Sequence, residues 1–123
     1  MSGVVVSRER FEELVGDALD SIPESLGSQM DNVVILVEEW PTPEQLRGHG
    51  MLLGLYEGVD LTRRGPMSYD GAAPDRITIF QGSLQRIARD ESDLAVQVRT
   101  TVLHEVGHHF GLSDSRLEEL GWA

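Results

Sequence analysis

The chain has 123 residues, enough for one domain with a modest hydrophobic core, so we treat residues 1–123 as a single domain. Its net charge is −11, and an acidic surface is expected to repel the phosphates of nucleic acids. The absence of Cys excludes disulfides and Cys-type zinc fingers, and no apolar stretch is long enough for a signal sequence or a membrane span. We therefore expect a cytoplasmic protein whose partners include neither nucleic acid nor membrane.

The first third of the chain predicts a helix and then a strand. Ser7 is a suitable N-cap, and apolar residues follow it at helical spacing, which predicts an amphipathic helix over residues 8–21 that stops at Pro23. Residues 24–31 are typical of a loop. Residues 33–37 form a short β-branched run that predicts a buried strand.

The middle of the chain is less regular. Thr42 and Gln45 can form a capping box around Pro43, which predicts one short helical turn. We expect a strand near residues 52–56, a long loop over residues 58–75 and a clear strand over residues 76–80. A short helix is expected over residues 83–89.

A long helix is predicted to begin at Asp90 or Ser92 and to run to about Phe110. Six of its apolar residues share one side of an ideal helix: Ala95, Val96, Val102, Leu103, Val106 and Phe110. His104 and His108 lie on the other side. One side therefore suits a core and the other a cleft, as an active-site helix requires. A last short helix is expected over residues 113–120, ending at Gly121.

Residues 104–114 read HEVGHHFGLSD and carry the pattern H-E-x-x-H-x-x-G-x-x-D. Each residue of a helix turns by about 100°, so His104, Glu105 and His108 fall within one third of the circumference. Two neutral imidazoles placed in this way can bind one Zn²⁺ at about 2.0–2.1 Å. The carboxylate of Glu105 would then lie beside the open position of the metal and could act as a general base.

Asp114 is the candidate third ligand of that metal. On a straight helix it would lie about 15 Å further along the axis than His104, so the chain must first turn back. Gly111 stands where a helix can end in the left-handed conformation, which would allow this turn. Glu118 is a rival third ligand. His109 points away from the metal side and is expected to support the site without binding the metal.

The motif resembles that of the zincin metallopeptidases, with Asp114 where metzincins carry a third His. The chain more closely resembles a family of small bacterial metallopeptidases, the minimal zincins, in residues 54–59 (GLYEGV), 74–80 (PDRITIF) and 103–114. The resemblance implies an α+β fold, in which a short mixed β-sheet packs against an N-terminal helix and a long active-site helix. It also implies Zn²⁺ bound by His104, His108 and Asp114, with Glu105 as the base. Metzincins place a Met-turn beneath the metal, and no Met follows the motif in this chain.

We therefore expect a zinc-dependent, metallopeptidase-like hydrolase that acts on a peptide or protein substrate. Glu105 would take a proton from zinc-bound water as the water attacks a peptide carbonyl, and would then pass the proton to the leaving amine. Tyr69, Tyr56 and His49 are candidates for a second oxyanion donor. By the resemblance, residues 76–80 are the candidate strand at the edge of the cleft that pairs with a peptide. The alternative is that they form an ordinary core strand.

Two other functions remain open at this point. Bacterial rRNA-processing metalloproteins carry three His at the same offsets, but they usually lack a Glu after the first His and need a basic surface. Glu105 and the net charge of −11 argue against that function. The third possibility is a zinc-stabilised module that holds a peptide without cleaving it. A set of two N ligands and one O ligand also accepts Fe, Co, Ni or Mn, so the motif does not fix the native metal.

Overall fold

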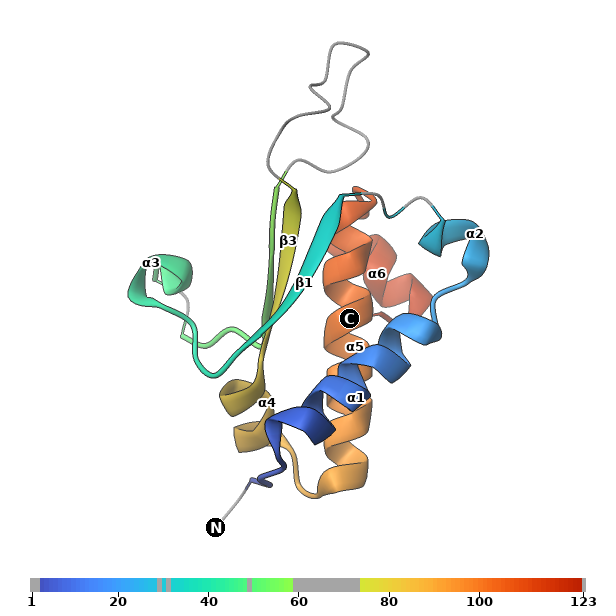
Figure 1. Ribbon diagram of the computed structural model, residues 1–123. Helices are drawn as coiled ribbons and strands as arrows, with labels where there is room; N and C mark the ends of the chain where they lie inside the picture. The colour runs from blue at the N-terminus through green and yellow to red at the C-terminus, as the bar shows by residue number, and fades with distance from the viewer. Residues whose placement is uncertain (1–2, 29, 31, 49, 59–73, 123) are drawn as a thin grey trace.

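The computed structural model describes residues 3–28, 30, 32–48, 50–58 and 74–122, in which short helices and strands lead to one long helix (Figure 1). The elements in chain order are α1 (Arg8–Asp20), α2 (Glu24–Gly27), β1 (Val33–Glu38), α3 (Pro43–Leu46), β2 (Gly54–Glu57), β3 (Asp75–Phe80), α4 (Gln81–Ile87), α5 (Glu91–His109) and α6 (Asp114–Leu120). Most of the loop predicted over residues 58–75 lies outside the described residues. Among the described helices, none combines the length and the apolar character needed to cross a bilayer.

The three strands form one mixed sheet in the order β1-β3-β2. β1 runs parallel to β3, with Val33 opposite Asp75. β2 runs antiparallel to β3, with Gly54 opposite Ile79. The central strand is therefore β3, and within the described part of the sheet its two neighbours each pair with a strand on one side only.

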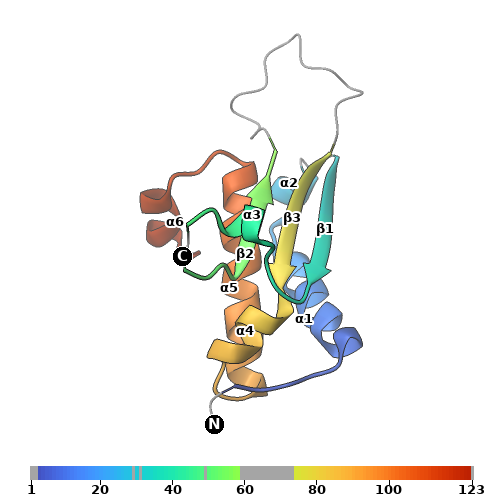
Figure 2. The same ribbon diagram turned by 90° about the vertical axis from the view of Figure 1, so that its left-hand side faces the viewer.

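Helices α1 and α5 cover the same face of this sheet, and α3 lies on the other side (Figures 1 and 2). Ser7 caps α1 as predicted, because its hydroxyl accepts a hydrogen bond of 3.0 Å from the backbone N–H of Arg10. The core between the layers is apolar: Phe11, Leu14, Val15 and Ala18 from α1, Ile77 and Ile79 from β3, and Leu94, Val98, Val102 and Val106 from α5. The predicted α+β fold, with a short mixed sheet against an N-terminal helix and a long helix, is confirmed.

Several local predictions are also confirmed. Thr42 and Gln45 form the expected capping box at the start of α3, and Asp90 caps α5 by accepting a hydrogen bond of 2.8 Å from the N–H of Asp93. Helix α6 ends at Gly121, which has a φ of 77°.

Three predictions, one on secondary structure and two on packing, were wrong. Residues 24–31 contain the short helix α2. The strand over residues 33–37 is an edge strand whose apolar residues are only partly buried, because only one strand pairs with it. In α5, Val96 is 61% exposed, and Leu94 and Val98 take the core positions, so the buried side of the first half of this helix is turned away from the predicted one.

Candidate metal centre

His104 and His108 lie one turn apart near the end of α5 and direct their rings to the same point. Their Nε2 atoms are 3.1 Å apart, and the two rings meet edge to face with centroids separated by 4.7 Å. Both side chains are partly exposed, so the two nitrogens face a site that solvent can reach. The helix therefore places two imidazole donors together, as the spacing predicts.

Asp114 reaches the two histidines because the chain reverses after α5. Gly111 has a φ of 79°, and the N–H of Leu112 donates to the carbonyl of Gly107 over 3.0 Å, as in a helix C-cap. Oδ1 of Asp114 then lies 3.9 Å from Nε2 of His104 and 3.7 Å from Nε2 of His108. The turn predicted at Gly111 is thus present, and Asp114 stands at the first residue of α6.

The three donor atoms have a spacing that suits a small tetrahedral metal. They all lie within 4.8 Å of one another. Around a tetrahedral zinc with bonds of about 2.0 Å, neighbouring ligand atoms would be separated by about 3.3 Å. The observed separations of 3.1, 3.7 and 3.9 Å are close to this value, so small side-chain adjustments suffice. Glu118 is not a member of the donor cluster found among the described residues.

The two rings are also oriented by backbone groups. Nδ1 of His104 lies 3.2 Å from the carbonyl oxygen of Trp122, and donation to that oxygen leaves Nε2 free to bind a metal. The ring of His108 makes a hydrogen bond with the backbone of Leu112. Burial, followed by the nearby His104, lowers the pKa of His108, whereas Asp114 and that backbone contact oppose the change. A lowered pKa favours the neutral imidazole that a metal requires.

Helix α6 and the residue that follows its cap support the site by packing against α5. Leu117 is fully buried against Gly107 of α5, where an added Cβ would lie only 2.2 Å from Cδ2 of Leu117. The N–H of Trp122 donates to the carbonyl of Leu117 over 2.8 Å, and this contact brings the Trp122 carbonyl back toward His104. The short segment after the motif therefore packs against the metal-side end of α5 and contacts the ring of His104.

Glu105 is the second acidic group of the site, and it is only 8% exposed. The stripe of core residues on α5 runs beside it, so its carboxyl group lies at the margin between the core and the metal side. Burial raises the pKa of Glu105 from 4.5 to about 7. The charge of Asp114 acts in the same direction, whereas a hydrogen bond from the backbone N–H of Tyr56 opposes the shift. A carboxyl group with this pKa can both accept and release a proton near neutral pH.

A cavity of about 320 Å³ opens beside Glu105, between α5 and the segment that leads into β2. Its lining is mainly apolar on the strand side and polar on the helix side: Met51, Leu52, Leu53, Gly54, Gln97, Thr100, Thr101, His104 and Glu105. Gly54 permits the close approach of these two walls. A Cβ on Gly54 would lie 2.8 Å from Cγ2 of Thr101 and 3.2 Å from Cγ of Glu105.

The strand at the edge of this site is β2, and the assignment of residues 76–80 to that role was wrong. Those residues form most of β3, which pairs on both sides, so the alternative of an ordinary core strand is correct. The N–H of Phe80 donates to the carbonyl of Leu53 over 3.0 Å. By the alternation of an antiparallel ladder, Gly54 and Tyr56 therefore direct their N–H and C=O groups away from β3.

A buried polar group close to the site was missed by the sequence reasoning. Asp75 accepts a hydrogen bond of 2.7 Å from the hydroxyl of Tyr56, and its Oδ2 lies 2.8 Å from Nδ1 of the fully buried His109. Tyr56, a candidate oxyanion donor, thus directs its hydroxyl to Asp75. His49 and Tyr69, the other two candidates, lie outside the described residues. The strand pattern of residues 76–80 gave no sign that Asp75 would be buried and paired.

Comparison with known proteins identifies the family of the chain. Residues 30–122 match the model of the zincin-like metallopeptidase family. The chain belongs to this family. It is also similar to a solved structure of a conserved hypothetical protein from Thermus thermophilus, with 28% identity and a TM-score of 0.56 over 94% of this chain and 97% of the other. No curated protein matches the chain.

Proposed function

We propose that this zincin-like protein is a zinc-dependent hydrolase of peptide bonds, with His104, His108 and Asp114 as the metal ligands. The observation that carries the proposal is the convergence of their three donor atoms within 4.8 Å, next to a buried carboxyl group. A zinc ion held there would polarise a substrate carbonyl and make a water molecule more acidic. The donor set of two imidazoles and one carboxylate matches that chemistry.

Glu105 is proposed as the general base and acid. Burial raises the pKa of Glu105 to about 7 in the metal-free protein, and a bound zinc ion would favour the carboxylate. That carboxylate would take a proton from the attacking water and return it to the leaving amine. The hydrogen bond from the backbone of Tyr56 fixes one side of the carboxyl group toward β2. Orientation of the base by the edge strand would place the proton transfer next to the peptide.

The outer edge of β2, on the side away from β3, is the proposed binding site for the peptide backbone. Gly54 directs both of its backbone groups outward, and Tyr56 directs its carbonyl outward, while its N–H is engaged by Glu105. An extended peptide can add to such an edge as a further strand. The cavity beside Glu105 would then receive an apolar side chain of the substrate.

The first experiment is the metal content of untagged protein, measured by elemental mass spectrometry. We expect about one equivalent of zinc in the wild type and its loss in both His104→Ala and Asp114→Ala. Retention of zinc in Asp114→Ala would move the third ligand to another group. Absence of metal from the wild type, even after zinc is added back, would refute the proposal.

Catalysis is tested separately with a peptide library and the variant Glu105→Ala. An enzyme should lose cleavage in this variant while it keeps its zinc, because Glu105 is not a proposed ligand. A module that only binds peptides should behave as the wild type does. Cleavage of RNA in place of peptides would support the rRNA-processing alternative, against which the net charge of −11 argues.

A further inference from the structure

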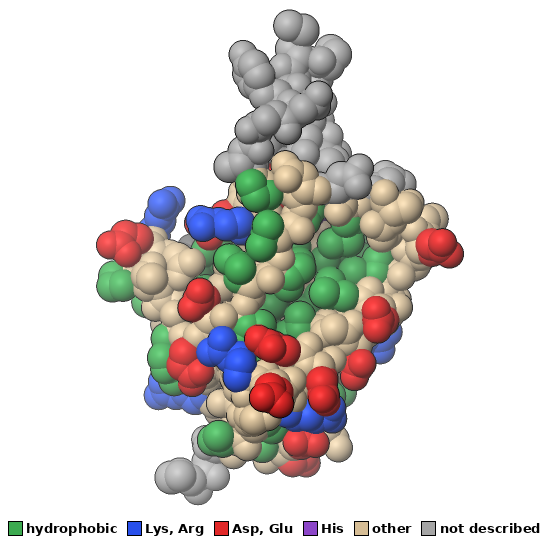
Figure 3. All heavy atoms as spheres, in the orientation of Figure 1, with side chains coloured by type: hydrophobic (Ala, Val, Ile, Leu, Met, Phe, Trp, Pro, Cys, Tyr) green, Lys and Arg blue, Asp and Glu red, His purple; other side chains and the backbone are tan. Residues whose placement is uncertain are grey.

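The second edge of the sheet carries an apolar groove that the proposed function does not use. The groove lies between β1 and α1, has a volume of about 430 Å³ and is lined by Glu12, Val15, Gly16, Leu19, Ile35, Leu36 and Val37. Figure 3 shows hydrophobic side chains gathered in a hollow on this face of the molecule. In the sheet order β1-β3-β2, this edge is separated from β2 and the candidate metal centre by the central strand.

The backbone of β1 offers hydrogen-bonding groups to this groove. Asn32 accepts a hydrogen bond of 3.0 Å from the N–H of Asp75, which sets the alternation of the parallel ladder. Val33, Ile35 and Val37 must then direct their N–H and C=O groups away from β3. No strand pairs with β1 on this side within the described ranges.

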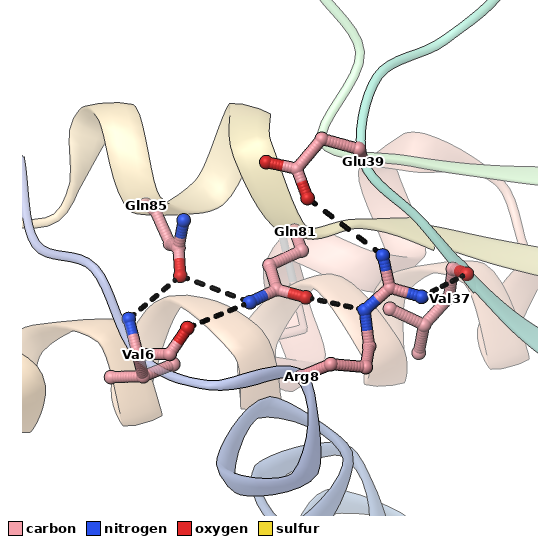
Figure 4. A network of polar contacts seen from close by, with 6 residues as sticks. All are labelled: Val6, Arg8, Val37, Glu39, Gln81 and Gln85. Atoms are coloured by element: carbon pink, nitrogen blue, oxygen red, sulfur yellow. Dashed lines mark hydrogen bonds and ion pairs between the residues drawn. The ribbon is translucent and has the colours of Figure 1, made fainter.

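One end of this edge is already capped by the chain itself. Nη1 of Arg8 donates to the carbonyl of Val37 over 3.1 Å, which independently confirms the outward direction of that carbonyl. Arg8 is held in place by Gln81, whose Oε1 accepts from Nε over 2.7 Å, and by Glu39 at 3.7 Å (Figure 4). The open part of the edge therefore runs from Val33 to Ile35.

The wall of the groove formed by α1 contains Gly16, a glycine that the packing of the described residues does not require. Gly16 lies inside α1, where Gly is less favourable than Ala, and a Cβ added there would meet nothing within 4 Å. It faces the groove, so the missing side chain leaves room that no described part of the chain fills. A glycine in such a position allows another backbone to approach closely.

The charges around the groove favour a basic occupant. Five acidic residues of α1 are exposed: Glu9, Glu12, Glu13, Asp17 and Asp20. The two basic residues of the same helix, Arg8 and Arg10, are both held in ion pairs with glutamates. A second copy of this chain would bring the same acidic helix into the contact, which like charges oppose.

We propose that β1 binds an extended segment of another protein as an additional strand. Its apolar residues would alternate with polar ones, so that one side enters the groove over Gly16, and Lys or Arg would flank them. The outward groups of Val33 and Ile35 supply the main-chain hydrogen bonds, and the acidic face of α1 attracts the basic flanks. The site is a docking surface on the far side of β3 from the proposed zinc site.

The test uses the full chain and a fluorescently labelled synthetic peptide in which Val alternates with Thr between terminal pairs of Arg. We expect saturable binding that weakens as salt is added. Gly16→Met should weaken binding by about tenfold or more, because its side chain fills the groove. Gly27→Met is the matched control, since Gly27 also has open space around it but does not line the groove, and its binding should be unchanged.

Amide hydrogen exchange gives a second readout that separates strand addition from loose association. The peptide should slow exchange at the outward amide of Ile35 and leave that of Leu36, already in the β1–β3 ladder, unchanged. Absence of binding at low salt, or equal binding by Gly16→Met, would overturn the proposal. A dimer that Gly16→Met dissociates would also overturn it, because the occupant would then be a second copy.

Discussion

Glu105 should make the metal-free protein less stable at neutral pH than it would be with a neutral residue at that position. The folded state buries the carboxyl group and raises its pKa from 4.5 to about 7, so the folded protein holds the proton more tightly than the unfolded chain. The stabilising effect of the protonated form is fully present below pH 4.5 and is lost as the pH rises through 7. Glu105→Gln, which mimics the protonated form, should therefore stabilise the apo protein at alkaline pH.

The size of the effect follows from the two pKa values. One pKa unit corresponds to about 1.4 kcal/mol. A rise of the pKa from 4.5 to about 7 should therefore make the unfolding free energy of Glu105→Gln larger than that of the wild type by about 3 kcal/mol at pH 8. At pH 5 the carboxyl group is largely protonated in the folded state, and the gain should fall below about 1 kcal/mol. The amide of Gln can still accept the hydrogen bond from the backbone of Tyr56, so the substitution changes charge and little else.

The assay is urea unfolding of wild type and Glu105→Gln at both pH values with a chelator present. Glu118→Gln is the control, because the same chemical change on the exposed surface of α6 should alter the unfolding free energy by less than about 0.5 kcal/mol. Equal stabilisation by Glu105→Gln at pH 5 and pH 8 would refute the reasoning, since the gain would not come from ionisation. With zinc bound, the positive ion should favour the carboxylate, and the gain should shrink.

Two further substitutions probe the supports of the site. Gly107→Ala should lower the affinity for zinc by about tenfold or more, because its Cβ would lie 2.2 Å from Leu117 and displace α6. A competition titration with a chromophoric chelator measures this affinity. Leu117→Ala in the same chain should restore part of it. Asp75→Ala should lower the unfolding free energy by about 3 kcal/mol, because it leaves the fully buried His109 without its carboxylate partner. A loss below about 1 kcal/mol in urea unfolding would contradict a structural role for this pair.

Features that depend on local sequence were predictable. The caps at Ser7 and Asp90, the capping box at Thr42 and the left-handed turn at Gly111 each rest on a few neighbouring residues whose chemistry has one common use. The approach of His104 and His108 follows from the geometry of one helix. The position of Asp114 next to these two residues depends on only one further turn of the chain after that helix.

Features that depend on the neighbours of a strand or helix in the fold could not be predicted from the sequence. Which strand lies at an edge is decided by the pairing partners, and a run such as residues 76–80 looks the same in either position. The burial of Asp75 against His109 joins residues 34 positions apart, with no local pattern to mark it. The buried side of α5 was misjudged because α1, which packs against it, fixes the rotation of the helix.

All the groups that form the candidate metal centre come from one short stretch of chain, from His104 to the carbonyl of Trp122. Closing so short a loop would take little conformational entropy, and none of the proposed ligands comes from a strand of the sheet. Occupancy of the site is then coupled to the local order of α6 more than to the global stability of the fold. The sheet and α1 supply none of the proposed ligands, so removal of an ion would disturb the packing of α6 on α5 first.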